Sequence, residues 1–205
     1  MNKFAYFLFL LGVGGFFYGY ESGNLIIQTL SKPIPLIILI IFVNKNNIYG
    51  KLIAIGFVFS LIGDILLAKA LNLFLFGLIS FLTAHIMYII AFVNNEKETA
   101  LIKSIPFYMY GAVLFIILKP HLGDMTVPVL FYVIVITTML WRAFVQRKSS
   151  DVANWAFVGA LFFTVSDTMI AIYRFNQHFM FDRELTIITY WIAQYLIFIS
   201  VKEKE

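Results

Sequence analysis

The feature that most constrains this chain is its division into long apolar runs separated by connectors of only a few residues. An α-helix needs about 20 apolar residues to cross the hydrocarbon core of a bilayer, and slightly fewer are tolerated. Eight runs meet this requirement, at residues 4–20, 25–43, 51–68, 71–93, 101–118, 126–145, 152–173 and 185–201. The sequence therefore predicts an all-α, polytopic membrane protein with eight transmembrane helices.

Composition favours a single integral membrane domain over residues 1–205. Hydrophobic residues make up 61% of the chain and charged residues 13%, whereas soluble domains carry about 25% charged residues. The chain contains no cysteine, which excludes disulfides, thiol catalysis and cysteine-ligated metals. The first apolar run could be mistaken for a signal peptide, but it lacks a small-x-small cleavage site. We therefore expect this run to be the first spanning helix.

The distribution of basic residues predicts the orientation of the helices. With the N-terminus inside, ten Lys and Arg residues fall on the inner side of the eight expected helices and five on the outer side. Basic residues are retained on the cytoplasmic side, so we expect both termini in the cytoplasm. The net charge of +4 thus reflects topology, and no nucleic-acid partner is expected. The five outer residues are Lys32, Lys69, Lys119, Arg174 and Arg183.

Two short segments resemble each other and share an acidic residue. FSLIGDILLA (59–68) superposes on FFTVSDTMIA (162–171), with Asp64 aligned on Asp167. This is the pattern of a parallel four-plus-four internal repeat, in which one unit is used twice in the same orientation. Short matches also arise by chance in an apolar background, so both interpretations remain open at this point.

Asp64 and Asp167 are carboxylic acids inside spanning helices, where ionisable groups are costly and by default indicate function. They precede Lys69 and Arg174 by five and seven residues, which places both about 8–10 Å inside those basic ends. If both face one cavity, desolvation and mutual repulsion leave one protonated and the other ionised. The alternative is that each aspartate only forms hydrogen bonds between helices.

Lys32 and Arg174 are candidates for binding an anionic head group near the non-cytoplasmic interface. Arginine in particular offers the forked geometry that phosphate prefers. The alternative is that both side chains reach out of the membrane to water, which is the commoner fate of such residues.

Four further polar residues lie within the expected spans. His85 is expected to relay protons or orient a hydrogen bond, or else to be a satisfied interhelical histidine, and Tyr88 shares its helix face. Tyr190 and Gln194 are four residues apart on the last helix, hence also on one face. One histidine without repeated ligand spacing gives little support for a metal site, so no metal is expected.

Six segments together resemble the YhhN family, the lysoplasmalogenases of bacteria and animals. The resemblance covers nearly the whole chain, and its most specific parts are the GD after an aromatic-Ser pair, the AH-x-x-Y and the SD-x-x-x-A. The segments are SKPIPL (31–36), FSLIGDILLA (59–68), FGLISFLTAHIMYIIAF (76–92), PVLFYVIVITTML (128–140), GALFFTVSDTMIAIYRF (159–175) and TYWIAQYLI (189–197).

The resemblance implies an eight-helix membrane hydrolase that cleaves the vinyl ether bond of lysoplasmalogens. The products are a fatty aldehyde and glycerophosphoethanolamine or glycerophosphocholine, and the expected location is a bacterial cytoplasmic (inner) membrane. It implies that Asp64 and Asp167 are catalytic, and that the lysophospholipid substrate is bound by Lys32, His85, Tyr88, Arg174, Tyr190 and Gln194.

The chemistry of a vinyl ether agrees with a pair of aspartates. Hydrolysis begins with protonation of the β-carbon, and water then captures the resulting oxocarbenium ion. This requires a neutral carboxylic acid and a nearby negative charge, as in two-carboxylate glycosidases, and no cofactor. We expect Asp64 to be the proton donor, because its neighbours along the chain are the more apolar.

Two other classes of function fit the same pattern of residues. A small proton-coupled transporter of lipids or other small molecules would also combine a parallel repeat with paired acidic residues at one depth. A lipid-binding or scaffold protein would use both aspartates only for structure. The transporter needs a proton gradient and leaves its substrate intact, whereas the enzyme works in detergent.

Overall fold

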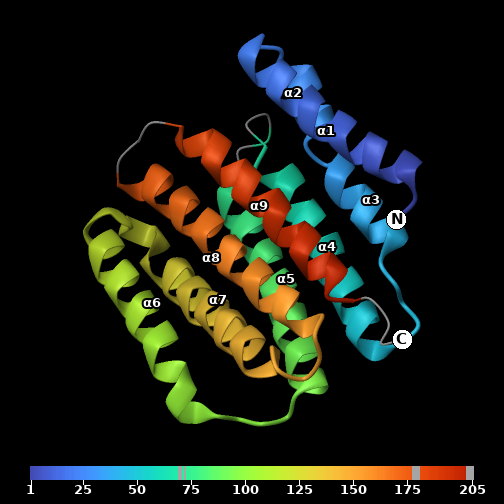
Figure 1. Ribbon diagram of the computed structural model, residues 1–205. Helices are drawn as coiled ribbons and strands as arrows, with labels where there is room; N and C mark the ends of the chain where they lie inside the picture. Colours follow the sequence, from blue (N-terminus) through green and yellow to red (C-terminus); the bar gives the residue numbers. More distant parts are fainter. Residues whose placement is uncertain (69–70, 72, 177–180, 202–205) are drawn as a thin grey trace.

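The computed structural model describes residues 1–68, 71, 73–176 and 181–201. These residues form helices joined by short connectors (Figure 1). The α-helices are α1 (Lys3–Glu21), α2 (Leu25–Ser31), α3 (Ile34–Phe42), α4 (Ile48–Leu66), α5 (Phe74–Asn95), α6 (Ile105–Leu118), α7 (Thr126–Gln146), α8 (Ala153–Phe175) and α9 (Asp182–Ile199). Three 3-10 turns flank α6: η1 (Leu101–Ser104), η2 (Lys119–His121) and η3 (Gly123–Met125).

Within the described residues, seven helical stretches are long and apolar enough to cross a membrane, which makes this an integral membrane protein. The eighth expected span, at 185–201, coincides with α9, which is not among the seven. Its first turn contains Asp182, Arg183 and Glu184, so α9 is less apolar than the other helices. The count of eight spans and the cytoplasmic location of both termini therefore stay predictions.

The second expected span is broken in its middle. Helix α2 ends at Ser31 and α3 begins at Ile34, with Lys32 and Pro33 between them. Proline has no backbone N–H and its ring clashes with the preceding turn, so it interrupts a helix. The span expected at 25–43 is present as the stretch Leu25–Phe42, but it is not one continuous helix. Because of the break, Lys32 lies within the span rather than at its outer end.

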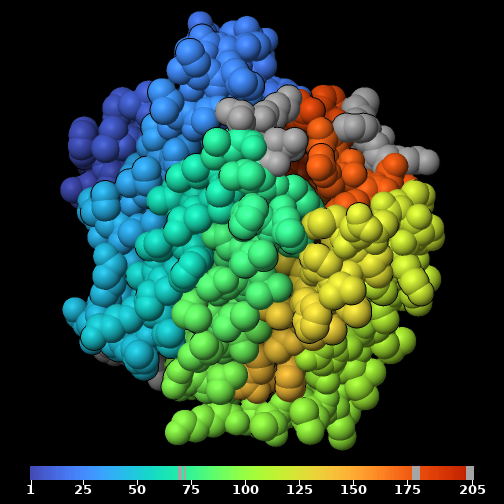
Figure 2. All heavy atoms as spheres, turned by 180° about the vertical axis from the view of Figure 1, so that it is seen from behind, coloured from blue at the N-terminus to red at the C-terminus, as the bar shows by residue number. Residues whose placement is uncertain are grey.

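The helices form closely associated pairs. Helix α4 packs along α5 and α8 along α9, while α7 lies between α5 and α8. Helix α6 lies on the outside against α7 and α8, and α1 to α3 pack on the side of α4 and α9 (Figure 1). Seen from behind, α4, α5 and α7 lie side by side (Figure 2). The two tightest pairs carry the two aspartates, but the internal repeat itself stays a prediction.

Glycines let the paired helices approach closely. A Cβ at Gly56 or Gly63 of α4 would collide with the rings of Tyr88 or Phe81 on α5. A Cβ at Gly159 of α8 would lie 2.9 Å from the carbonyl oxygen of Ala193 on α9. In a membrane, helices associate largely through such close packing at small residues.

The contact at Gly159 predicts that Gly159→Ala destabilises the protein by about 1–3 kcal/mol, because the neighbouring atoms belong to the α9 backbone and cannot move aside. Gly14→Ala is the matched control, since nothing lies within 4 Å of its added Cβ. It should be neutral or stabilise by up to about 1 kcal/mol through helix propensity. Thermal unfolding in detergent measures both variants, and equal transition midpoints would contradict this close packing.

Candidate active site

Asp64 lies in the last turn of α4 and is held from two other helical segments. Lys32, at the break between α2 and α3, places Nζ 2.9 Å from Oδ1. Tyr190 of α9 donates a hydrogen bond to Oδ2 at 2.8 Å. The aspartate side chain is only 4% exposed. Asp64 is thus a buried carboxylate whose charge is matched by a lysine.

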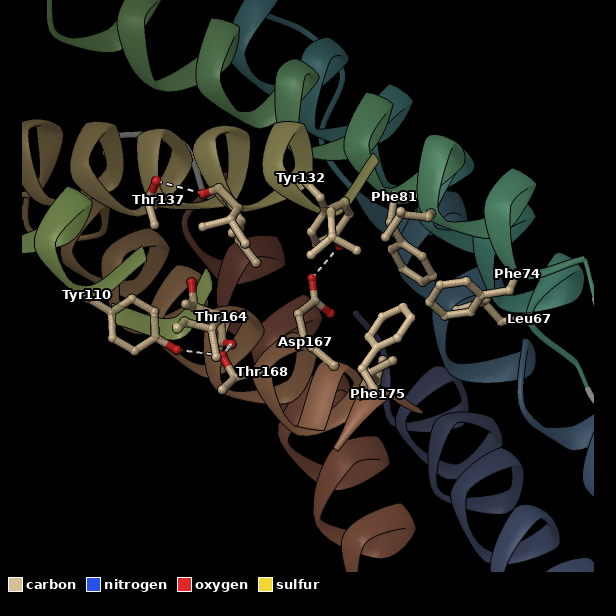
Figure 3. A pocket seen from close by; sticks show the side chains of 17 residues that line it. Leu67, Phe74, Phe81, Tyr110, Tyr132, Thr137, Thr164, Asp167, Thr168 and Phe175 are labelled. Atoms are coloured by element: carbon tan, nitrogen blue, oxygen red, sulfur yellow. Dashed lines mark hydrogen bonds between the residues drawn. The ribbon is translucent and has the colours of Figure 1, made fainter. Parts of the chain in front are cut away.

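Asp167 lies in the middle of α8 in a different environment. The hydroxyl of Tyr132 on α7 donates a hydrogen bond to Oδ2 (Figure 3). His85 on α5 places Nε2 3.7 Å from the same oxygen, which is too far for a hydrogen bond. In the described part of the chain, no lysine or arginine is paired with Asp167, and no residue donates to Oδ1.

The two aspartates belong to one site, because the same aromatic ring lies beside the partners of both. The ring of Phe163 on α8 is 4.7 Å from the His85 ring and 5.4 Å from the Tyr190 ring, measured between centroids. The structure therefore places the two aspartates in neighbouring regions, and their action as a catalytic pair stays a prediction.

A cavity of about 570 Å³ lies beside Asp64, within the range of about 300–1,000 Å³ typical of ligand sites. Lys32, Arg174 and Arg183 line it together with the aspartate. The Arg174 guanidinium lies 5.0 Å from the centroid of the Phe74 ring, and Arg183 donates to the Tyr173 hydroxyl at 2.8 Å. Among the described residues neither arginine forms an ion pair with a carboxylate. Asp182 also lines the cavity, so three basic side chains stand against two carboxylates, and the excess of positive charge suits an anion.

A second cavity, of about 50 Å³, lies beside Asp167 and is lined almost entirely by apolar groups. Tyr132 lies in its wall and points toward the aspartate (Figure 3). Leu67, Phe74 and Ile170 line both cavities, so the two are adjacent. Asp64 thus faces a cavity that has charged side chains in its otherwise apolar lining, and Asp167 faces a cavity lined almost entirely by apolar groups.

The remaining predicted site residues are buried between helices and lie outside the two cavities. His85, Tyr88, Tyr190 and Gln194 are buried and line neither of these cavities. The Tyr88 hydroxyl donates to Gln194 Oε1 at 3.0 Å, while both ring nitrogens of His85 and Nε2 of Gln194 have no hydrogen-bond partner among the described residues. Direct contact of these four residues with a substrate stays a prediction.

Two residues at the site were not found from the sequence. Tyr132 reaches Asp167 from 35 positions away, and within the apolar run of α7 nothing distinguishes it from a membrane-facing tyrosine. Arg183 stood outside the expected last span and was counted only for topology.

Lys69, from which the depth of Asp64 in the membrane was inferred, lies outside the described residues. No group of three or more potential metal ligands occurs in the residues that are described.

The buried pair predicts that Lys32→Met destabilises the protein by about 3 kcal/mol, because Asp64 is left as an uncompensated buried charge. Adding Asp64→Asn in the same chain should recover most of this loss. Lys103→Met, which breaks the exposed pair between Lys103 and Glu98, is the control and should cost less than about 1 kcal/mol. Free energies of unfolding in detergent test this, and similar losses for both lysines would refute it.

Comparison with known proteins shows the family of this chain. The chain matches the model of the YhhN family over residues 27–201. It is 31% identical to human lysoplasmalogenase TMEM86A over 195 residues, covering 87% of this chain and 80% of the relative. It is 32% identical to human lysoplasmalogenase TMEM86B over 174 residues, covering 83% of this chain and 74% of the relative.

A bacterial relative is similar over a shorter stretch. The lysoplasmalogenase of Mycobacterium bovis is 33% identical over 109 residues, which cover 50% of this chain and 41% of the relative. No solved structure matches the chain. The family model nevertheless extends from α2 through α9 and so includes both aspartates and, apart from Phe16 and Leu25, all residues that line the two cavities. The chain belongs to the YhhN family.

Proposed function

We propose that this protein is a lysoplasmalogenase, which hydrolyses the sn-1 vinyl ether bond of lysoplasmenylethanolamine or lysoplasmenylcholine. The products are a fatty aldehyde and glycerophosphoethanolamine or glycerophosphocholine. The observation that carries the proposal is the pair of aspartates in contrasting surroundings. Asp64 is paired with a lysine beside a cavity that contains basic side chains, and Asp167 has a tyrosine donor beside an apolar cavity. The names of the relatives support the same reaction.

Asp167 is the proton donor in this proposal. A carboxyl group without a positive partner in an apolar cavity favours its neutral form. Since Tyr132 donates to Oδ2, the acidic proton is carried by Oδ1. The Oδ1–H bond breaks as the π electrons of the vinyl ether form a new C–H bond at the β-carbon. The adjacent carbon becomes an oxocarbenium ion, and Asp167 is left as a carboxylate that accepts a hydrogen bond from Tyr132.

In this proposal the Asp64 carboxylate stabilises the oxocarbenium ion and orients the water molecule that attacks it. The ion pair with Lys32 and the hydrogen bond from Tyr190 support its ionised form. Water adds to the oxocarbenium carbon beside Asp64 and gives one proton to the Asp167 carboxylate, which restores the acid. The hemiacetal then collapses to an aldehyde and an alcohol, and no proton is consumed overall.

This assignment reverses the expectation that Asp64 is the donor. That expectation rested on Ile65, Leu66 and Leu67, the apolar neighbours of Asp64 along the chain. The groups that face the Asp64 carboxylate come instead from other helical segments, and one of them is a lysine. The ion pair therefore argues for Asp64 as the carboxylate and Asp167 as the acid.

The head group of the lysolipid occupies the 570 Å³ cavity in this proposal. Arg174 and Arg183 supply two guanidinium groups for the phosphodiester, and Lys32 supplies an ammonium group beside Asp64. The vinyl ether then lies near the wall that both cavities share. We place the protein in the cytoplasmic membrane of a bacterium, with the substrate drawn from the bilayer.

The first test is an assay of the purified protein in detergent. We expect release of fatty aldehyde from a lysoplasmalogen and no release of fatty acid from the acyl lysophospholipid with the same head group. Activity without a membrane gradient is the outcome that separates an enzyme from a proton-coupled transporter. Failure to cleave the vinyl ether under conditions where the protein remains folded would refute the proposed function.

The second test separates the roles of the aspartates. Asp167→Asn should lower kcat at least about 100-fold, because it removes the general acid, while Asp64→Asn should retain more activity. Turnover in D₂O should place one deuterium on the carbon next to the aldehyde, detected by mass spectrometry after reduction to the alcohol. Full activity of Asp167→Asn would exclude the mechanism, and Ser104→Ala, a buried hydroxyl remote from both cavities, is the control.

A further inference from the structure

The position of the acid determines where the hydrocarbon chain of the substrate must lie. In a vinyl ether, R–CH=CH–O–, the β-carbon that accepts the proton is also the carbon that carries the chain R. The carbon on the other side of the double bond carries the ether oxygen and hence the glycerophosphate. A donor at Asp167 therefore has the start of the chain beside it and the head group on the opposite side.

The narrow cavity beside Asp167 has the composition expected for such a chain. Its walls come from α5, α6, α7 and α8, and apart from Asp167 its polar residues are Tyr110, Tyr132, Thr137, Thr164 and Thr168. The hydroxyls of these five residues are hydrogen-bonded to other protein groups, so they do not require a polar ligand. Figure 3 shows Asp167 at the centre of this space, with Phe74, Phe81 and Phe175 on one side.

The outer wall of this cavity faces the surroundings of the protein. Tyr110 on α6 lines the cavity and is also 39% exposed, and its hydroxyl is hydrogen-bonded to Thr168 of α8 (Figure 3). Most of the neighbouring α6 side chains are exposed, including Val113, Ile116 and Ile117. In a spanning segment these residues contact lipid. The contact between Tyr110 and Thr168 is therefore a boundary between the cavity and the bilayer.

We propose that the apolar cavity between α6, α7 and α8 binds the first few carbons of the alkenyl chain, and that the rest of the chain passes Tyr110 into the bilayer. This inference rests on the proposed vinyl ether hydrolysis. The cavity volume of about 50 Å³ is small beside the 570 Å³ of the cavity next to Asp64. It accommodates the start of a chain and not its whole length.

A size change in the cavity wall tests this binding site. Ala171 lines the cavity one helical turn after Asp167, and Ala171→Phe would fill the space. Ala112→Phe is the matched control, because Ala112 is an exposed residue of α6 that lines neither cavity. Each variant is assayed with a hexadecenyl and with a propenyl glycerophosphocholine ether, whose chain beyond the β-carbon is a single methyl group.

The measured quantity is the ratio of kcat/KM for the long substrate to kcat/KM for the short one. Ala171→Phe should lower this ratio at least tenfold relative to the wild type, whereas Ala112→Phe should leave it within twofold. An unchanged ratio in Ala171→Phe would overturn the chain site, whatever the absolute rates. If the wild type cleaves neither ether, the proposed function fails, and the chain site is then decided by the labelling experiment that follows.

Photolabelling locates the chain without requiring turnover. The probes are 1-O-hexadecyl glycerophosphocholines, saturated ethers that resist acid hydrolysis, with a diazirine either near the ether oxygen or near the chain end. The first probe should label residues of the cavity such as Val133 and Ile136. The second should label the exposed face of α6 at Val113 or Ile117. Labels from both probes confined to α1, α2 and α3 would overturn the inference.

Discussion

The ion pair between Lys32 and Asp64 is the interaction on which the arrangement of this site depends. A buried carboxylate is tolerated when a matched charge and hydrogen bonds compensate for the water it has lost. Here the charge comes from a lysine that a continuous helix would hold elsewhere, because Lys32 reaches Asp64 from the break between α2 and α3. The pair joins the N-terminal helices to α4, and Tyr190 joins α9 to the same carboxylate.

Each aspartate accepts a hydrogen bond from a tyrosine hydroxyl, but in the part of the chain that the structure describes only Asp64 has a lysine beside it. Asp167 has a tyrosine donor and a histidine nearby, and no cation among the described residues. Two carboxyl groups in one site take different protonation states when their surroundings differ. The difference arises from tertiary contacts, since α2, α3 and α9 surround one aspartate and α5 and α7 the other.

Much of the fold was predictable, because an apolar run of about 20 residues predicts a membrane-spanning helix. The acidic pair was also predictable, since a carboxylate in such a run is costly and conspicuous. The break at Pro33 was not predicted, because a proline near the start of a run is equally compatible with helix initiation. Tyr132 and the pairing of Lys32 were missed for a different reason, as both depend on contacts between distant segments. Which aspartate is the donor stays a prediction, and our proposal reverses the first assignment because flanking residues do not show which helix faces a side chain.

The adjacency of a polar and an apolar cavity has a consequence for what happens after cleavage. In the proposed reaction the glycerophosphodiester is formed where charged side chains and water are available, and the aldehyde is formed where the wall borders lipid. The two products then leave into different phases, one aqueous and one hydrocarbon. Their re-encounter at the site becomes rare, so partitioning between the phases gives the hydrolysis its direction and delivers the aldehyde into the membrane.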